Sequence, residues 1–159
     1  MAQGTQNKSG KNWNWKGGDL TRKIHVGMLK NMHRACNKGK NIVVQSFPAP
    51  TMLGTRGGGP PAVRTGHLRR NVNYEVKSLG ELKILGRVGT GVGNAESVGY
   101  AVWLEYGTRP SPGRYVPAIG KRVNNGMHPG IAPRPFLRPL INHKAKREEI
   151  EKELGRRIF

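Results

Sequence analysis

Apolar residues recur at three- to four-residue spacing over the first third of the chain, from Asp19 to about Phe47. This spacing predicts one long amphipathic helix with Asp19 as its N-cap and its end in the region 41–47. The apolar positions are Leu20, Ile24, Met28, Met32, Ala35 or Cys36, and Val43. The opposite face carries bases that suit phosphates, although a solvated face is the commoner explanation of such a run. These bases are Arg22, Lys23, Lys30, Arg34, Lys38 and Lys40.

The middle of the chain changes to alternation of apolar and polar residues, the pattern of half-buried β-strands. One run covers residues 71–77 and the next covers 81–89. Residues 78–80, Ser-Leu-Gly, have the composition of a short turn. We therefore expect two antiparallel strands joined by this turn. The alternating apolar positions are Val72, Tyr74, Val76, Leu82, Ile84 and Val88.

The stretch 100–140 contains two blocks whose composition predicts docking segments. The first, Tyr-Ala-Val-Trp-Leu-Glu-Tyr-Gly-Thr at 100–108, predicts a short amphipathic turn closed by Gly107, with Tyr100, Trp103 and Leu104 in the core. The second, Ala-Pro-Arg-Pro-Phe-Leu-Arg-Pro-Leu at 132–140, predicts an extended segment, because proline fixes φ and lacks an N–H donor.

The last residues, 142–159, predict a charged surface helix with only a weak apolar stripe. Together these patterns predict an α+β fold in which a long N-terminal helix packs on a small antiparallel sheet, followed by an extended Pro-rich segment and a C-terminal helix. We expect a single domain over 19–159 with long loops at 46–64 and 107–131.

Residues 1–18 are polar and Gly-rich, which predicts a disordered basic arm. Trp13 and Trp15 are unusual in such a stretch. Two large aromatic side chains in such a stretch are expected to bind a surface, a partner subunit or a stacked base, or else to fold back onto their own domain.

The net charge of the 159-residue chain is +19, and it is distributed unevenly. Residues 71–105, which include the predicted strands, are nearly neutral, whereas residues 106–147 carry nine bases and no acid. Charge concentrated on arms and loops favours an extended polyanion or an acidic protein surface as partner over a small acidic substrate. We find no apolar run of membrane-spanning length and no signal peptide pattern, and we expect a cytoplasmic protein.

Candidate chemistry is sparse. The glycine-rich segment 55–61 ends in two prolines instead of the Lys-Ser/Thr of a phosphate-binding loop, and 89–94 lacks the third glycine of a dinucleotide motif. His33 and Cys36 lie three residues apart on the predicted helix, but no further metal ligand is near. Cys36 is the single cysteine, so no internal disulfide forms. We expect no catalytic residues, no metal and no cofactor.

The order of these pieces resembles the tail-completion, or neck, protein family of long-tailed double-stranded DNA phages. The likeness covers roughly residues 20–150 and is most specific in the Tyr-Ala-x-x-x-Glu-Tyr-Gly-Thr block and in Arg-Pro-Phe-Leu-Arg-Pro at 134–139. It implies a non-enzymatic structural subunit of a sixfold or twelvefold ring at the head–tail connector. The implied location is the virion neck or tail, reached after assembly in the host cytoplasm.

The expected contact residues form two groups. Glu105 is expected to pair with Arg134 or Arg138, within or between subunits, while Phe136 and Leu137 anchor the Pro-rich block, with ordinary core packing as the alternative. The expected subunit and partner interface is Tyr100, Trp103, Glu105, Tyr106, Arg134, Phe136, Leu137 and Arg138. The expected contacts to channel DNA or to an acidic partner are Lys8, Lys11, Lys16, Arg109, Arg114, Lys121 and Arg122.

The expected partners are identical copies, the adjacent neck proteins (a head-completion or adaptor ring, and a tail terminator or tail tube) and non-specific double-stranded DNA. The basic segment 109–131 and the arm 1–18 are departures from the family pattern. The alternative function is a free basic nucleic-acid-binding protein, for instance one associated with ribosomal RNA, in which Trp13, Trp15 and Tyr115 stack on bases. No recognised RNA- or DNA-reading motif supports it.

Overall fold

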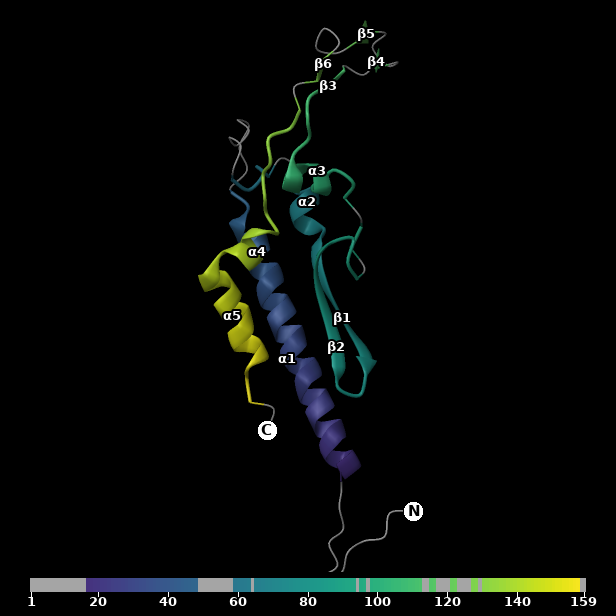
Figure 1. Cartoon of the computed structure of the whole chain (residues 1–159), viewed down its shortest axis with the longest axis vertical. Helices are drawn as coiled ribbons and strands as arrows, with labels where there is room; N and C mark the ends of the chain where they lie inside the picture. The colour runs from purple at the N-terminus through teal and green to yellow at the C-terminus, as the bar shows by residue number, and fades with distance from the viewer. Residues whose placement is uncertain are drawn as a thin grey trace, which may run out of the picture.

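The computed structural model has an α+β fold built around one long helix, as the sequence predicts (Figure 1). Helix α1 (Gly17–Ser46) lies in the centre, with the hairpin of β1 (Val72–Gly80) and β2 (Lys83–Thr90) on one side and helix α5 (Lys144–Leu154) on the other. The structure describes residues 17–48, 59–63, 65–93, 95–96, 98–112, 115–116, 121–122, 127–128 and 130–157. Asp19 lies within the first turn of α1, so its expected role as N-cap is wrong.

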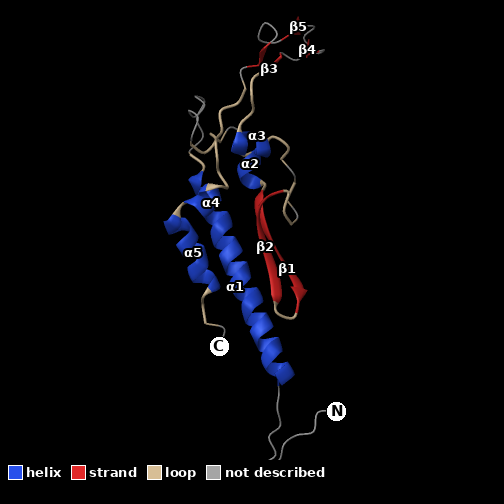
Figure 2. Cartoon of the chain, in the orientation of Figure 1, coloured by secondary structure: helices blue, strands red, loops and turns tan. Residues whose placement is uncertain are grey.

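The remaining elements are short; the helices lie near the C-terminal end of α1, whereas the strands lie farther out, beyond α3 (Figure 2). They are the helices α2 (His67–Arg70), α3 (Ala101–Tyr106) and α4 (Pro139–Asn142), and the two-residue strands β3 (Ser111–Pro112), β4 (Tyr115–Val116), β5 (Lys121–Arg122) and β6 (Met127–His128).

The segment between α3 and α4, expected to be a long loop, contains antiparallel pairs. Thr108 pairs with Ile131, Ser111 with His128 and Pro112 with Met127. These three pairs share one antiparallel register. Farther out, Tyr115 pairs with Arg122 and Val116 with Lys121. We call this segment, 108–131, the outer hairpin; its strands lie beyond α3, away from α1 (Figure 1).

The β1–β2 hairpin confirms both predicted strands but not the turn between them. The ladder continues through Ser78↔Ile84 to Gly80↔Lys83, with an irregularity between Ser78 and Gly80. The turn is therefore Glu81–Leu82, and Ser78–Gly80 belongs to β1. The prediction failed because a β-bulge and a turn favour the same small and glycine residues.

The apolar face of α1 packs between the hairpin and α5 because small residues allow close approach. Ala35, Cys36 and Gly39 are buried, and a Cβ on Gly39 would lie 3.5 Å from Ile150 of α5 and 3.6 Å from Val88 of β2. At Gly86 the approach is closer still: a Cβ there would lie 2.5 Å from Cys36 Sγ. This burial raises the pKa of the Cys36 thiol.

A second set of contacts closes the fold at the C-terminal end of α1. Buried side chains from six parts of the chain meet there, which explains why the short helices gather at this end. The cluster consists of Val43, Phe47, Leu68, Val72, Val98, Ala101 and Phe136.

Helix α5 is held to α1 by polar contacts that its weak apolar stripe did not predict. The buried Asn31 side chain donates from Nδ2 to the carbonyl oxygens of Leu154, at 3.2 Å, and Arg156, at 2.7 Å. Lys38 Nζ lies 2.8 Å from a carboxylate oxygen of Glu149. The helix spans Lys144–Leu154, and the described residues 155–157 of the expected range 142–159 are not helical.

We predict that Gly86→Val lowers the free energy of unfolding by roughly 1–3 kcal/mol, because the added atoms overpack the contact with Cys36 and Met32. Gly99→Ala is the control, since a Cβ there has no atom within 4 Å. Urea titrations of both variants test this. Equal midpoints for the two would show that the hairpin does not pack closely on α1.

Candidate subunit interface around Glu105

The two sequence blocks at 100–108 and 132–140 lie side by side. The Arg134 amide donates to the Leu104 carbonyl at 2.6 Å, and Thr108 and Ile131 exchange backbone hydrogen bonds of 2.9 and 3.2 Å. The Pro-rich block therefore runs antiparallel to the chain that leaves α3, and the same pairing forms the base of the outer hairpin.

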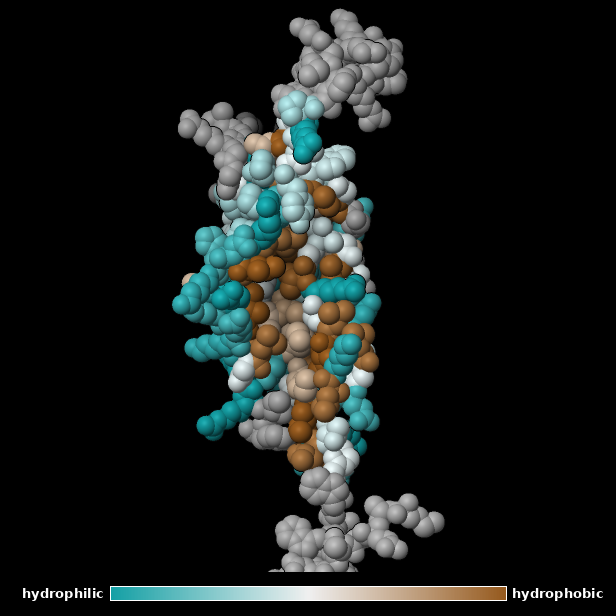
Figure 3. All heavy atoms as spheres, in the orientation of Figure 1, coloured by the Kyte–Doolittle hydropathy of each residue, from teal (hydrophilic) through white to brown (hydrophobic). Residues whose placement is uncertain are grey.

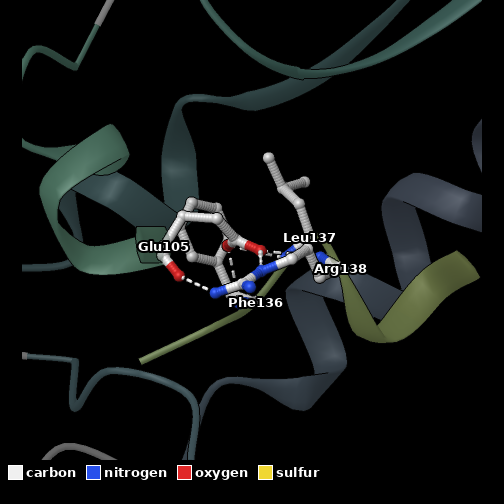
Figure 4. A network of polar contacts seen from close by, with 4 residues as sticks. All are labelled: Glu105, Phe136, Leu137 and Arg138. Atoms are coloured by element: carbon white, nitrogen blue, oxygen red, sulfur yellow. Dashed lines mark hydrogen bonds and ion pairs between the residues drawn. The ribbon is translucent and has the colours of Figure 1, made fainter. Parts of the chain in front are cut away.

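The carboxylate of Glu105 joins the blocks at their centre (Figure 4). Its Oε2 accepts hydrogen bonds from the amides of Phe136, at 2.9 Å, and Leu137, at 3.1 Å, and its Oε1 accepts from the Arg138 amide at 2.8 Å. The Arg138 guanidinium adds a contact from Nε to Oε1 at 3.3 Å and one from Nη2 to the Glu105 carbonyl. Because the Glu105 side chain is only 6% exposed, these donors replace the water that it would otherwise need.

The three amides are available because they precede a helix. Helix α4 starts at Pro139, whose missing N–H is tolerated at the first helical position, and the amides of 136–138 have no partner within that helix. Successive backbone N–H groups of this kind form a concave binding site for an anion. The expected extended conformation is therefore wrong for Pro139 and Leu140, which are helical.

Gly107 makes the close contact between the blocks possible. Its φ of 74° and ψ of 178° are accessible essentially to glycine alone. A Cβ at this position would lie 2.6 Å from the Ile131 carbonyl oxygen and 2.9 Å from the Pro133 ring. The predicted closure of the first block by Gly107 is confirmed.

The two candidate partners of Glu105 differ sharply. Arg138 pairs with Glu105 inside the chain, and its guanidinium carbon also lies 4.8 Å from the ring centroid of Tyr106. Arg134 makes no side-chain contact with Glu105 in the part of the chain that the structure describes; its Nε is buried and has no hydrogen-bond partner there. Arg134 instead borders a hollow of about 670 Å³ between α2 and α3.

The other predicted interface residues separate into buried and exposed groups. Phe136 is 1% exposed and packs against Phe47, with ring centroids 5.6 Å apart, and Leu137 packs against the same core. These two anchors therefore take the core role that we kept as the alternative. Tyr100 and Trp103 are 41% and 56% exposed, so their expected place in the core is wrong. The buried side of α3 consists of Ala101 and Glu105, with Leu104 partly buried, in helical spacing.

Several large apolar side chains stay exposed around α3 and α4. We define the α3–α4 surface as Val102, Trp103, Tyr106 and Ile141, which are 56–70% exposed. It borders a groove of about 510 Å³ that is lined by β2, α3, α4 and α5. Figure 3 shows hydrophobic side chains gathered in the strip between α5 and the β1–β2 hairpin.

The predicted DNA-contact residues are only partly described. Arg109 is exposed at the base of the outer hairpin, and Lys121 and Arg122 form β5, whose side chains are not described. Lys8, Lys11, Lys16 and Arg114 lie outside the described residues, as do Trp13 and Trp15. On α1, Lys38 and Lys40 make contacts within the chain, with Glu149 and Asn73, whereas Arg22, Lys23, Lys30 and Arg34 are exposed.

His33 and Cys36 face different neighbours. The His33 ring packs edge-on against Tyr74, with centroids 6.0 Å apart, while Cys36 lies against Gly86. Within the described residues, no three His, Cys, Asp or Glu side chains are grouped to hold a metal ion, and none of the helices there has the length and apolarity needed to cross a bilayer.

Comparison of the chain with models of known protein families gives no match. Comparison with curated proteins and comparison with solved structures also give none.

We predict that Glu105→Gln lowers the free energy of unfolding by at least about 2 kcal/mol, because an amide nitrogen would face buried N–H donors. The control is Glu149→Gln, which removes the half-exposed pair with Lys38 and should cost less than about 1 kcal/mol. Chemical denaturation of both variants tests this. Similar small losses would contradict the role of Glu105 in joining the blocks.

Proposed function

We propose that this chain is a structural subunit of the neck or tail of a long-tailed double-stranded DNA phage, where it joins head to tail as part of a sixfold or twelvefold ring around the DNA channel. The observation that carries the proposal is the exposed α3–α4 surface. The proposal also draws on the order of the two sequence blocks that resemble this family, and on the hydrogen bonds through which Glu105 joins them.

The α3–α4 surface supports assembly because α3 has almost no polar side. Its sequence is Ala-Val-Trp-Leu-Glu-Tyr, and its one charged residue, Glu105, is turned inward. A short helix that is apolar all round is normally buried. Val102, Trp103 and Tyr106 nevertheless remain exposed in the single chain. Tryptophan and tyrosine are also the residues that contribute most to protein–protein interfaces.

The basic charge supports contact with the DNA that passes through a neck. Between Tyr106 and Arg147 the chain has nine bases and no acid, and four of these bases lie in the outer hairpin. A hairpin that lies away from the body can bring such bases to a polyanion without reading its sequence. Adjacent neck proteins would contact other surfaces of the ring.

We predict that Trp103→Glu weakens self-association by at least about 2 kcal/mol, or roughly thirtyfold, because a charge replaces an apolar contact at the surface. Val26→Glu is the control, since Val26 is 59% exposed on α1 and outside the α3–α4 surface. Analytical ultracentrifugation over a concentration series measures both. Equal effects of the two substitutions would count against an interface at α3.

We predict that replacing Arg109, Arg114, Lys121 and Arg122 with alanine reduces the salt dependence of DNA binding. The slope of log K against log salt should decrease by about 0.9 for each phosphate contact that is lost. The triple variant with alanine at Lys8, Lys11 and Lys16 tests the arm in the same way. Binding to duplexes of different sequence, followed by fluorescence anisotropy, gives the slopes. An unchanged slope in both variants would exclude these bases from DNA contact.

The same titration distinguishes the alternative of a free nucleic-acid-binding protein. Nanomolar binding by an isolated monomer favours that alternative, whereas ring formation without nucleic acid favours the neck subunit.

A further inference from the structure

The groove beside α3 is a candidate binding site. Its volume of about 510 Å³ is in the range of pockets that hold a compact ligand, roughly 300–1,000 Å³. Its lining is mainly aliphatic and includes Val88, Leu137, Leu140 and Ile150. The four charged residues of the lining are paired, Glu105 with Arg138 and Arg147 with Glu151, and most of the other lining residues are apolar.

One wall of this groove includes two residues of β2, a strand whose other edge is unpaired in the described residues. In the described residues β2 pairs only with β1, and the groove is lined by Val88 and Thr90 of β2 but by no residue of β1. An unpaired strand edge offers N–H and C=O groups to an added strand. A segment that pairs with β2 would send alternate side chains to one face, so two apolar residues spaced two apart suit the site.

The sequence before the described part of α1 contains two large apolar residues at this spacing. Trp13 and Trp15 are two residues apart, within the 16 residues that precede the described part of α1. Both indoles would lie on the same side of an extended segment.

The distance between Gly17 and the groove determines whether this segment can come from the same chain or only from another copy. Val88 lies beside Gly39, which is 22 residues, or about 33 Å of helix, beyond Gly17. Trp13 is four residues before Gly17 and can lie at most about 14 Å from it. The two tryptophans therefore cannot enter the groove of their own chain. Those of a neighbouring copy can enter it where that copy's Gly17 lies within about 14 Å of the groove.

We propose that the groove between β2, α3, α4 and α5 binds the Trp13–Trp15 segment of a neighbouring copy as an added strand on β2. This rests on the proposed function only in requiring that copies lie next to each other. It gives residues 1–16 a specific role, to link adjacent subunits, and it makes the α3–α4 surface the rim of that contact.

The test is crosslinking between two full-length variants, Lys16→Cys and Ile141→Cys, mixed in equal amounts with a short bismaleimide. Lys16 adjoins Trp15, and Ile141 is a 70% exposed residue of the groove, so both tryptophans are kept. The matched control replaces Ile141→Cys with Val26→Cys, an exposed position on α1 about 20 Å of helix from Gly39. The native Cys36 is buried and should not react.

We expect a mixed dimer that contains one of each variant, at least tenfold more abundant with Ile141→Cys than with Val26→Cys. Adding Trp13→Ala and Trp15→Ala to the Lys16→Cys chain should abolish this excess. Equal yields with the two acceptor positions, or an excess that survives loss of both tryptophans, would overturn the proposal. Crosslinking within a single chain that carries both Lys16→Cys and Ile141→Cys, at high dilution, would also overturn it.

Ring formation is measured separately, by the mass of the uncrosslinked protein. Rings without the specific crosslink would overturn this docking mode and leave the neck proposal standing. The specific crosslink in dimers that never form rings would support the docking mode and count against the neck proposal.

Discussion

The structure at the C-terminal end of α1 depends on how one buried carboxylate is satisfied. Glu105 sits on the inner side of α3, where a charge without partners would be strongly unfavourable. The amides of 136–138 and the Arg138 guanidinium satisfy it, and in doing so they fix where the Pro-rich block lies and where α4 begins. Phe136 is carried into the core by the same arrangement.

For function, the residues of the two blocks have two different roles. The residues that bind each other inside the chain, Glu105, Phe136 and Arg138, set the geometry, and the residues that they leave outside, Val102, Trp103, Tyr106 and Ile141, form an apolar surface. Assembly into a ring would cover that surface. In this account the contacts between the two blocks that resemble neck proteins fix the local fold. The fold in turn determines which side chains are exposed at the interface.

Sequence periodicity predicted the large elements because α1 and the β1–β2 strands bury one face each. It failed where a contact depends on backbone groups or on a few residues. Arg138 was one of the two partners predicted for Glu105. The three backbone amides that also bind Glu105 could not be predicted, because backbone groups leave no pattern in the side chains of the sequence. Tyr100 and Trp103 were predicted to lie in the core, although the inward direction of Glu105 turns them outward. Asn31, which binds the end of α5, looks like an ordinary polar helix residue; only its position on the apolar side of α1 marks it.

The central claim is that the exposed surface beside the Glu105 site is an interface between copies of this chain. Cryo-electron microscopy of the purified full-length protein tests it most directly. The account predicts closed rings in which each α3–α4 surface is covered by a neighbouring copy. Dispersed single chains, or oligomers in which Val102, Trp103 and Tyr106 remain in solvent, would contradict it.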